Sequence, residues 1–192
     1  EVNQIKLTNK SSEKKSFTLF SYIEFCLWNA MDDMTNFQRN LNIGEVEVIG
    51  STIYHKTEYR ERRNHYAIYS VNTKIDGFDT SRDAFLGAYR GADSPEAVEN
   101  GKCTNSMASG WSPIASHQIN VDLAAGETKT FIFVLGYIEN PEDEKWESYG
   151  VINKTRAKEM LAKYQTDAQV EEAFAALQAY WKQLLARYTV DS

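Results

Sequence analysis

Hydrophobic and polar residues alternate with a period of two over most of the chain up to Ile138. The pattern is strongest from Phe17 to Trp28, where two apolar sets point to opposite faces. Phe17, Leu19, Ile23, Phe25 and Leu27 form one set, and Phe20, Tyr22, Cys26 and Trp28 form the other. A strand that is apolar on both faces is buried on both sides. We therefore expect this strand to lie in the middle of a layered β structure.

A polar loop follows this strand directly. Residues 29–40 are rich in amides and acids and include one arginine. A polar loop that is held on a rigid strand is a common way to present a binding site. This loop is therefore the first place to look for function.

Three further pairs of segments have the alternation and turn signals of β-hairpins. We expect residues 2–7 to pair with 17–28, residues 45–49 with 52–57 across Gly50-Ser51, and residues 114–123 with 128–138 around Gly126. Residues 131–135 are apolar on both faces, which predicts another central strand. Shorter strands are expected at 67–72 and 84–89, with a long loop over 91–113.

The period changes to that of a helix near the C-terminus. Asn153 is positioned to cap a first helix, and Thr166 to Gln169 fits a capping box before a second. An apolar stripe then recurs at helical spacing, through Val170, Phe174, Leu177, Trp181, Leu184 and Tyr188. We expect this stripe to be buried, either against the β domain or against a further domain. The fold class is therefore mainly β, an antiparallel β-sandwich over residues 1–150 followed by two helices over 151–192.

Composition narrows the class of protein without choosing a function. The 192 residues are 42% hydrophobic and 25% charged, as is typical of a globular domain. The net charge of −6 argues against a nucleic-acid partner. Two cysteines, Cys26 and Cys103, are too few for a disulfide scaffold.

No apolar run reaches membrane-spanning length and no signal peptide is evident, so we expect a cytoplasmic location. Because the chain opens on a strand without an initiating Met, we interpret it as part of a longer protein.

Asn29, Asn36 and Arg39 are the candidate binding residues of the polar loop. Two amides and one guanidinium supply donors and acceptors in fixed planes, which suits sugar hydroxyls. The alternative is a loop that ties itself together by side-chain to backbone hydrogen bonds. Asp32 and Asp33 are adjacent in sequence, which favours a solvated or capping role over a pair of glycosidase carboxylates.

Other chemistry-bearing residues favour structural roles. His55, His65 and His117 match no metal-binding spacing. The mixed charges of residues 58–63 favour an ion-pair network or an interface over a phosphate site. Trp28, Trp111 and Trp146 are candidates for stacking on sugar rings, although core or interface packing is the commoner use of tryptophan. No short nucleotide-binding, hydrolase or metalloprotease motif is present.

Several long strings resemble a known family. They are FSYIEFCLWNAMDDMTNFQRNLNIGEVEV, IYHKTEYRERRNHYA, GFDTSRDAF, GWSPIASH, LGYIENPEDEKWES and GVINK, which together span nearly the whole chain. These strings resemble the cellobiose phosphorylases of glycoside hydrolase family 94. The resemblance covers the later part of an N-terminal β-sandwich of the super-sandwich type and the helical linker after it.

The resemblance implies an activity that this chain does not contain in full. Enzymes of this kind convert cellobiose and inorganic phosphate to α-glucose 1-phosphate and glucose with inversion, using phosphate as co-substrate and no cofactor. Phosphate takes the place of the water of an inverting hydrolase, so one general acid suffices. That acid belongs to an (α/α)6 barrel after the linker, so no residue of this chain is implied to be catalytic.

The resemblance also implies a role for the polar loop. It matches Asn29, Asn36 and Arg39 to positions near the acceptor glucose, and it implies a homodimer. Arg39 is the strongest candidate because its guanidinium can hold two hydroxyls at once. The alternative is a stand-alone, non-catalytic carbohydrate-binding or dimerisation module built on the same sandwich.

Overall fold

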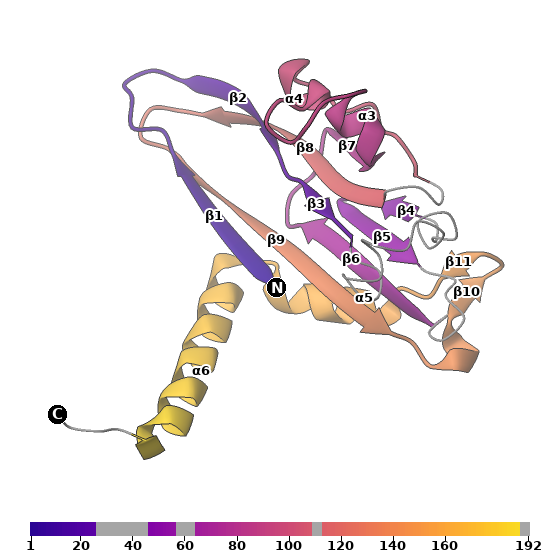
Figure 1. Ribbon diagram of the computed structural model, residues 1–192. Coiled ribbons are helices and arrows are strands. Elements are labelled where there is room, and N and C mark those ends of the chain that lie inside the picture. The colour runs from indigo at the N-terminus through magenta and orange to yellow at the C-terminus, as the bar shows by residue number, and fades with distance from the viewer. Residues whose placement is uncertain (26–45, 57–63, 109–112, 189–192) are drawn as a thin grey trace.

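Two antiparallel β-sheets face each other in the computed structural model, which describes residues 1–25, 46–56, 64–108 and 113–188 (Figure 1). Short helices cover the outer faces of both sheets, and one long helix, α6 (Asp167–Leu185), extends away from them (Figure 1). The predicted fold class, a mainly β antiparallel sandwich with helices at the C-terminus, is confirmed. The boundary predicted at residue 150 stays a prediction.

The larger sheet has the strand order β1-β9-β6-β5-β4 among the described residues. Its strands are β1 (Val2–Thr8), β9 (Thr128–Glu139), β6 (His65–Val71), β5 (Thr52–Lys56) and β4 (Val46–Ile49). The hairpin expected across Gly50 is confirmed, because Ile49 pairs with Thr52. Gly50 has a φ of 60°, a left-handed conformation that glycine adopts without a Cβ clash.

The smaller sheet is built around β8 (Pro113–Leu123), which pairs with β2 (Lys15–Phe20), β3 (Ile23–Glu24) and β7 (Gly77–Ser81). Phe20 pairs with Gln118 and Ile23 with Ala115, so β2 and β3 share one register and form one interrupted strand. β7 pairs with the same stretch of β8 that β3 pairs with, and it therefore occupies the opposite edge.

The two-faced strand predicted from the sequence is confirmed within its described part. Leu19 and Ile23 pack into the core between the sheets, whereas Phe20 and Tyr22 pack against the helices on the other face. The strand thus lies in a middle layer, but at an edge of its own sheet. Phe17, near the outer end, is consequently 40% exposed.

The main core lies between the two sheets. The larger sheet contributes Val46, Ile53, Tyr69, Val71, Phe131 and Phe133, and the smaller sheet contributes Ala115, Ile119, Val121 and Leu123. Alternate residues of the larger sheet, among them Ile68, Ile132 and Val134, point to its outer face. Residues 131–135 are therefore a central strand, as predicted, with Phe131 and Phe133 on one face and Ile132 and Val134 on the other.

Helices complete the two outer layers. α5 (Thr155–Leu161) packs Ala157 and Leu161 on the outer face of the larger sheet, together with Ile152 of β11 (Val151–Ile152) and Val170 of α6. On the smaller sheet, α3 (Arg82–Leu86) and α4 (Glu96–Glu99) bury Phe85, Leu86 and Ala97. The strand expected at 84–89 is therefore wrong. Phe85 and Leu86 are adjacent and both buried, which a helix achieves and an alternating strand does not. The expected loop over 91–113 likewise contains α4.

Two of the three expected hairpins are wrong. β1 and β2 belong to different sheets, and so do β8 and β9, so both connections cross from one sheet to the other. Asn9 joins the two crossings: its Nδ2 donates to the carbonyl oxygens of Leu123 and Ala124, each at 3.0 Å. Its backbone N–H donates to Glu127 at 2.9 Å. The alternation located these four strands correctly, but it carries no information on which sheet each one joins.

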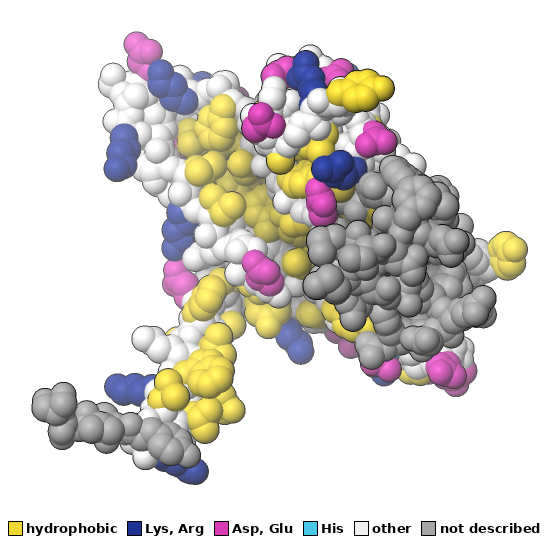
Figure 2. Space-filling model, in the orientation of Figure 1, with side chains coloured by type: hydrophobic (Ala, Val, Ile, Leu, Met, Phe, Trp, Pro, Cys, Tyr) yellow, Lys and Arg dark blue, Asp and Glu magenta, His cyan; other side chains and the backbone are white. Residues whose placement is uncertain are grey.

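The long helix α6 (Asp167–Leu185) follows η2 (Ala162–Tyr164) and precedes η3 (Ala186–Tyr188). The predicted capping box is confirmed, because the side chains of Thr166 and Gln169 each bond the other's backbone N–H. From Phe174 to Leu184 the apolar stripe is exposed, and Figure 2 shows hydrophobic side chains along this helix. The β domain therefore does not cover the stripe. In the described part of the chain, no helix has the length and apolar character needed to span a membrane.

Candidate functional site

At one end of the sandwich lie the strand ends that adjoin residues 26–45, 57–63 and 109–112, the internal segments outside the described residues. Val46 of β4 pairs with His55 of β5, and the Phe25 backbone N–H donates to Pro113 at 3.5 Å. The rings of Phe25 and His55 stack, which brings these two strand ends together across the sandwich. Residues 26–45, 57–63 and 109–112 therefore all attach at this end, which we name the loop end. The crossings joined by Asn9 lie at the opposite end.

Asn29, Asn36 and Arg39 lie outside the described residues, and so do Asp32, Asp33, Trp28, Trp111 and residues 58–63. The sugar-binding role of the three candidates therefore stays a prediction. The segment that carries them attaches to the described residues at Phe25 and Val46.

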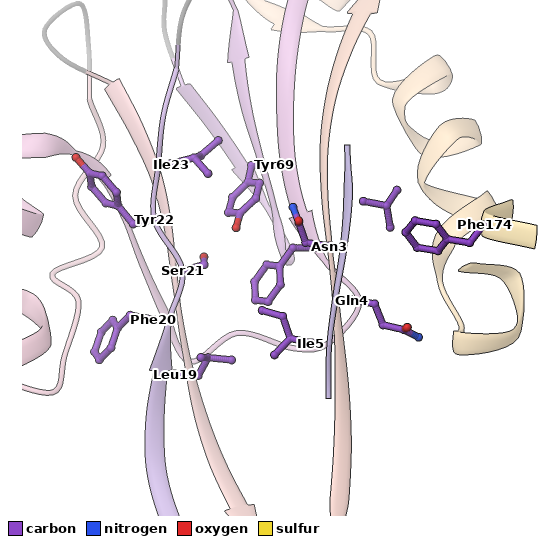
Figure 3. Close-up of a pocket in the computed structure, with 12 residues that line it drawn as sticks. Asn3, Gln4, Ile5, Leu19, Phe20, Ser21, Tyr22, Ile23, Tyr69 and Phe174 are labelled. Atoms are coloured by element: carbon purple, nitrogen blue, oxygen red, sulfur yellow. The ribbon is translucent and has the colours of Figure 1, made fainter. Parts of the chain in front are cut away.

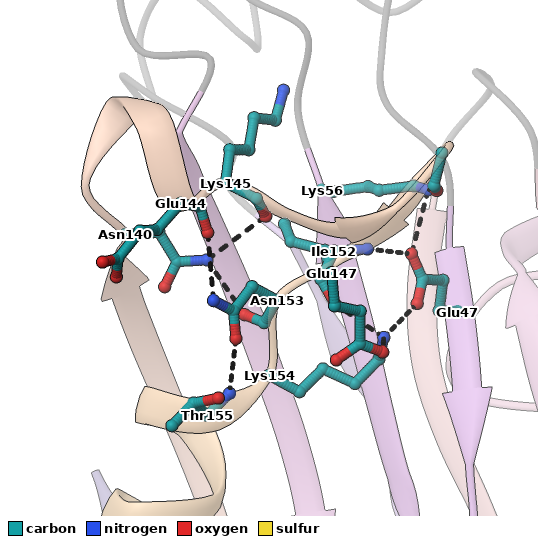
Figure 4. Close-up of polar contacts among 11 residues, drawn as sticks. Glu47, Lys56, Asn140, Glu144, Lys145, Glu147, Ile152, Asn153, Lys154 and Thr155 are labelled. Carbon is teal, nitrogen blue, oxygen red and sulfur yellow. Dashed lines mark hydrogen bonds and ion pairs between the residues drawn. The ribbon is translucent and has the colours of Figure 1, made fainter.

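A buried ion-pair network ties the described elements of the loop end together (Figure 4). The Glu47 carboxylate of β4 accepts from Lys56 Nζ at 2.9 Å and from Lys154 Nζ at 2.6 Å. It also accepts the backbone N–H of Ile152 at 3.0 Å. Lys154 further contacts Glu147 at 3.3 Å, and Lys56 donates to the Gly150 carbonyl. We call Glu47, Lys56, Glu147 and Lys154 the Glu47 network.

The electrostatics of this network favour the ionised carboxylate. Burial by itself raises the pKa of Glu47, but hydrogen bonds from Lys154, from the Ile152 N–H and from Lys56 outweigh it and hold that pKa below its ordinary value. The side chains of Lys56 and Lys154 are only 4% and 1% exposed. Glu47 is therefore the counter-ion that allows both lysines to be buried.

The side-chain amides of Asn140 and Asn153 hold the segment between β9 and α5 in place by hydrogen bonds (Figure 4). Asn140 is buried, and its Nδ2 donates to the Asn153 carbonyl at 2.9 Å. The Asn153 Oδ1 accepts the Thr155 N–H, the first of α5, at 3.0 Å. The predicted cap Asn153 thus bonds the helix from one position before Lys154, the N-cap residue.

Trp146 opens β10 (Trp146–Ser148) beside the Glu47 network. The ammonium groups of Lys145 and Lys56 lie 4.2 and 5.2 Å from its ring centroid, within cation–π distance. The ring is 39% exposed. Of the tryptophans singled out as candidates, Trp146 is the one that the structure describes. Two lysines contact its ring, and whether this tryptophan packs at an interface or stacks on a sugar stays a prediction.

The histidines are placed apart from one another. His55 and His117 are fully buried between the sheets, and His65, which is also buried, contacts Tyr137 and Glu139 of β9. Within the described ranges, no group of three or more His, Cys, Asp and Glu side chains is arranged to hold a metal ion.

A groove of ≈ 610 Å³ lies between β1 and the β2–β3 strand, at the open edge of the sandwich (Figure 3). Asn3 and Ile5 face it from β1, and Leu19 and Tyr69 lie across from them (Figure 3). Its polar side chains are partly engaged elsewhere: Ser21 Oγ bonds His117 Nδ1 at 3.1 Å, and Gln4 donates to Asp167 at 3.0 Å. A sugar site needs several convergent polar groups, so we do not place one in this groove.

Comparison with known proteins identifies the family. The profile described as "Glycosyl hydrolase 94, supersandwich domain" matches residues 1–167. The chain belongs to glycosyl hydrolase family 94. The matched segment contains both sheets, α5 and the Glu47 network, so the loop end lies within the part of the chain that matches the supersandwich domain.

Curated relatives agree with this family. The chain is 28% identical over its full length to the N,N'-diacetylchitobiose phosphorylases of Vibrio furnissii and Vibrio proteolyticus. It is also 25% identical, over 93% of its length, to the solabiose phosphorylase of Paenibacillus borealis. The chain spans 22% of the length of each of these relatives. The family expected from the sequence is therefore confirmed, whereas the expected substrate, cellobiose, stays a proposal.

Sequence reasoning missed the Glu47 network. A weak signal was present, because Lys56 lies within the predicted strand 52–57 and Lys154 directly follows the predicted cap Asn153. The partners of Glu47 are far away along the chain, so only the fold reveals that these charges meet.

Proposed function

We propose that this chain is the supersandwich portion of an inverting disaccharide phosphorylase that acts on cellobiose. The supporting observation is the family match over residues 1–167, together with curated relatives that are themselves disaccharide phosphorylases. In the proposed reaction a phosphate oxygen attacks the anomeric carbon from the face opposite the leaving glucose. The glycosidic bond breaks and a general acid protonates the departing oxygen, which gives α-glucose 1-phosphate and glucose.

In this proposal the present chain shapes the acceptor side of the active site. Asn29, Asn36 and Arg39 bind hydroxyls of the acceptor glucose, and the general acid lies in an (α/α)6 barrel after α6. Inorganic phosphate is a co-substrate, and neither a metal nor an organic cofactor takes part. The full protein is a cytoplasmic homodimer, and the chain studied alone is inactive.

A second candidate substrate is N,N'-diacetylchitobiose, because two of the relatives carry that name. Sequence strings favoured cellobiose, whereas these relatives favour the acetylated sugar. The two candidates differ in the sugar phosphate that they release, so one assay separates them.

The test incubates the full-length protein with phosphate and, in turn, cellobiose, N,N'-diacetylchitobiose and solabiose. We expect α-glucose 1-phosphate from cellobiose, detected by phosphorus NMR, and no product from the 192-residue chain alone. Release of an N-acetylglucosamine phosphate would instead establish the second candidate. A full-length protein that releases no sugar phosphate from any of the three would favour a non-catalytic carbohydrate-binding or dimerisation module.

A further inference from the structure

We propose that α6 carries a docking surface for an α-helix of the full-length protein outside residues 1–192. The surface, which we name the α6 seam, consists of Phe174, Leu177, Trp181 and Leu184. This inference rests on the proposed function, which adds a helical barrel to this chain. It names the surface of the chain that such a barrel contacts.

The α6 seam is far more apolar than an exposed helix normally is. Its four side chains are each between 40% and 52% exposed, and the flanking Tyr180 and Leu185 are exposed as well. Figure 2 shows these hydrophobic side chains on the projecting helix. Lys182 is the only charged residue between Ala173 and Leu185. A helix that is apolar over so much of its surface is normally buried. Nothing in the part of the chain that the structure describes covers it, so its cover comes from elsewhere.

The first turn of α6 is fixed to the sandwich, so the seam is presented in one direction. Val170 is buried in the cluster beneath α5. Gln4 of β1 donates to Asp167 at 3.0 Å, and Lys6 Nζ of β1 donates to Glu171 at 3.1 Å. The capping box prevents the same end from fraying. Because the helix is oriented before it meets a partner, docking costs little conformational entropy.

The spacing and chemistry of the seam indicate a helical partner. Its members are three or four positions apart, which aligns them along one side of α6. Side chains in such a row pack into the spaces between the side chains of a facing helix. A loop or an edge strand would instead bring unpaired backbone N–H and C=O groups, which an apolar seam cannot satisfy. A helix bonds its own backbone, so an amphipathic helix with an apolar face is the occupant that fits.

The extent of the surface favours a partner within the same polypeptide. Six side chains that are about half exposed leave on the order of 600 Å² to cover, which is the lower end of the range for contacts between domains of one chain. Two copies joined through α6 would bury about twice that area, which is the lower limit for a stable complex of separate chains. A covalently linked domain needs less area, because the link keeps it at a high effective concentration. This chain spans 22% of the length of its curated relatives, so proteins of that size have room for such a domain.

The test introduces Trp181→Ser into both the 192-residue chain and the full-length protein. In the chain alone the melting temperature should change by less than about 2 °C, because the ring is already half in water. In the full-length protein the unfolding transition of the sandwich should fall by about 5 °C, because the partner helix loses a buried contact. Trp181→Phe, which keeps an aromatic ring on the seam, should recover most of that loss.

Ala179→Ser is the matched control on the same helix. It introduces the same side chain two positions before Trp181, about 200° around the helix and therefore away from the seam. It should shift the melting temperature by less than about 2 °C in both proteins. If Trp181→Ser prevents the full-length protein from folding, Leu177→Gln is the milder variant, and it should lower the melting temperature of the full-length protein only.

Light scattering coupled to size-exclusion chromatography tests the other possible occupant, a second copy of this chain. We expect the 192-residue chain to be a monomer, with the same mass after Trp181→Ser. A dimer that this substitution converts to a monomer would assign the seam to a second copy and overturn the inference. Equally small shifts of the melting temperature in both proteins would show that the seam stays in water, and would overturn it too.

Neither result depends on catalysis, so a failure of this inference is distinguishable from a failure of the proposed function. The proposed function fails when the full-length protein releases no sugar phosphate from any of the three disaccharides. The docking surface fails when the melting temperature of the full-length protein does not respond to changes on the α6 seam.

Discussion

His55 of β5 stacks on Phe25 of the opposite sheet, with ring centroids 4.9 Å apart and an angle of 22° between the planes. The other sheet provides the reciprocal contact, because His117 of β8 stacks on Tyr69 of β6 at 5.0 Å. Among the residues that the structure describes, neither ring nitrogen of His55 has a hydrogen-bond partner. Two neutral imidazoles therefore bridge the sandwich.

This arrangement predicts that the domain loses stability in mild acid. Burial lowers the pKa of His55 to about 3 and that of His117 to about 4, whereas both are near 6.5 when unfolded. Below pH 6.5 the unfolded chain binds protons that the folded chain excludes. The free energy of unfolding therefore falls as pH drops from about 6.5 toward 4. For each histidine, the unfolding equilibrium constant rises about tenfold per pH unit over this range.

Urea denaturation at a series of pH values between 7.5 and 4.5 measures this slope. His55→Phe keeps an aromatic ring against Phe25 and removes one titrating group. The variant should show a slope that is smaller by about one proton over the same range. Identical slopes for the variant and the wild type would show that His55 is protonated in the folded state.

Replacing the Asp79 side chain by that of alanine is expected to cause a large loss of stability. This carboxylate of β7 is fully buried, and its Oδ1 accepts from the N–H and hydroxyl groups of both Thr104 and Ser106, at 2.6–3.1 Å. Asp79→Ala leaves these donors without their acceptor and should cost about 3–5 kcal/mol. Asp76→Ala, which removes a single exposed hydrogen bond to Asn120, is the control and should cost about 1 kcal/mol or less. Comparable losses in urea denaturation would contradict the assignment.

The exposure of α6 predicts contrasting effects along one apolar stripe. Val170 is 1% exposed and packs under α5, so Val170→Ala should lower the stability of this chain by about 1–3 kcal/mol. Trp181 is 49% exposed, and Trp181→Ser should change the stability by no more than about 0.5 kcal/mol. Thermal melts of both variants test this. A strong destabilisation by Trp181→Ser would mean that the stripe is covered in solution.

Cys103 is predicted to be chemically inert in the folded domain. Burial, with the nearby Asp79 carboxylate, raises the pKa of its thiol to about 12, so the reactive thiolate is scarce at neutral pH. Alkylation by iodoacetamide, followed by peptide mass spectrometry, should leave Cys103 unmodified in buffer and modify it in urea. Rapid labelling in buffer would show that the contacts of α3 and α4 open readily.

Most of the strands were readable from the sequence because their cause is local. Successive side chains on a strand point to opposite faces, so a strand with one buried face has a hydrophobic pattern of period two. This pattern can be recognised without knowledge of the fold. The choice of partner strand is not local. Residues 114–123 and 128–138 have hairpin-like spacing, yet the four residues between them cross the sandwich instead of turning back within one sheet. The alternation of β8 and β9 is the same for either outcome.

The candidate site was predictable to a smaller degree. The family was recognisable because long strings of unusual composition carry it. The Glu47 network was not, since Glu47 and Lys154 are 107 positions apart (154 − 47 = 107) and meet only through the packing of β11 and α5 on the sheet. Lys154 resembled a surface residue before a helix, and its burial depends on a carboxylate from a distant strand.

The position of β1 has a consequence for how the chain is made. Asn3 pairs with Phe133, so β1 leaves the ribosome 130 residues before its partner strand does (133 − 3 = 130). β9 also completes β6 on its other side. Until β9 emerges, both strands expose unpaired edges, which are prone to join other chains. Contacts of such long range also slow folding. The nascent domain therefore stays vulnerable to aggregation until β9, one of the last strands to be synthesised, closes the sheet.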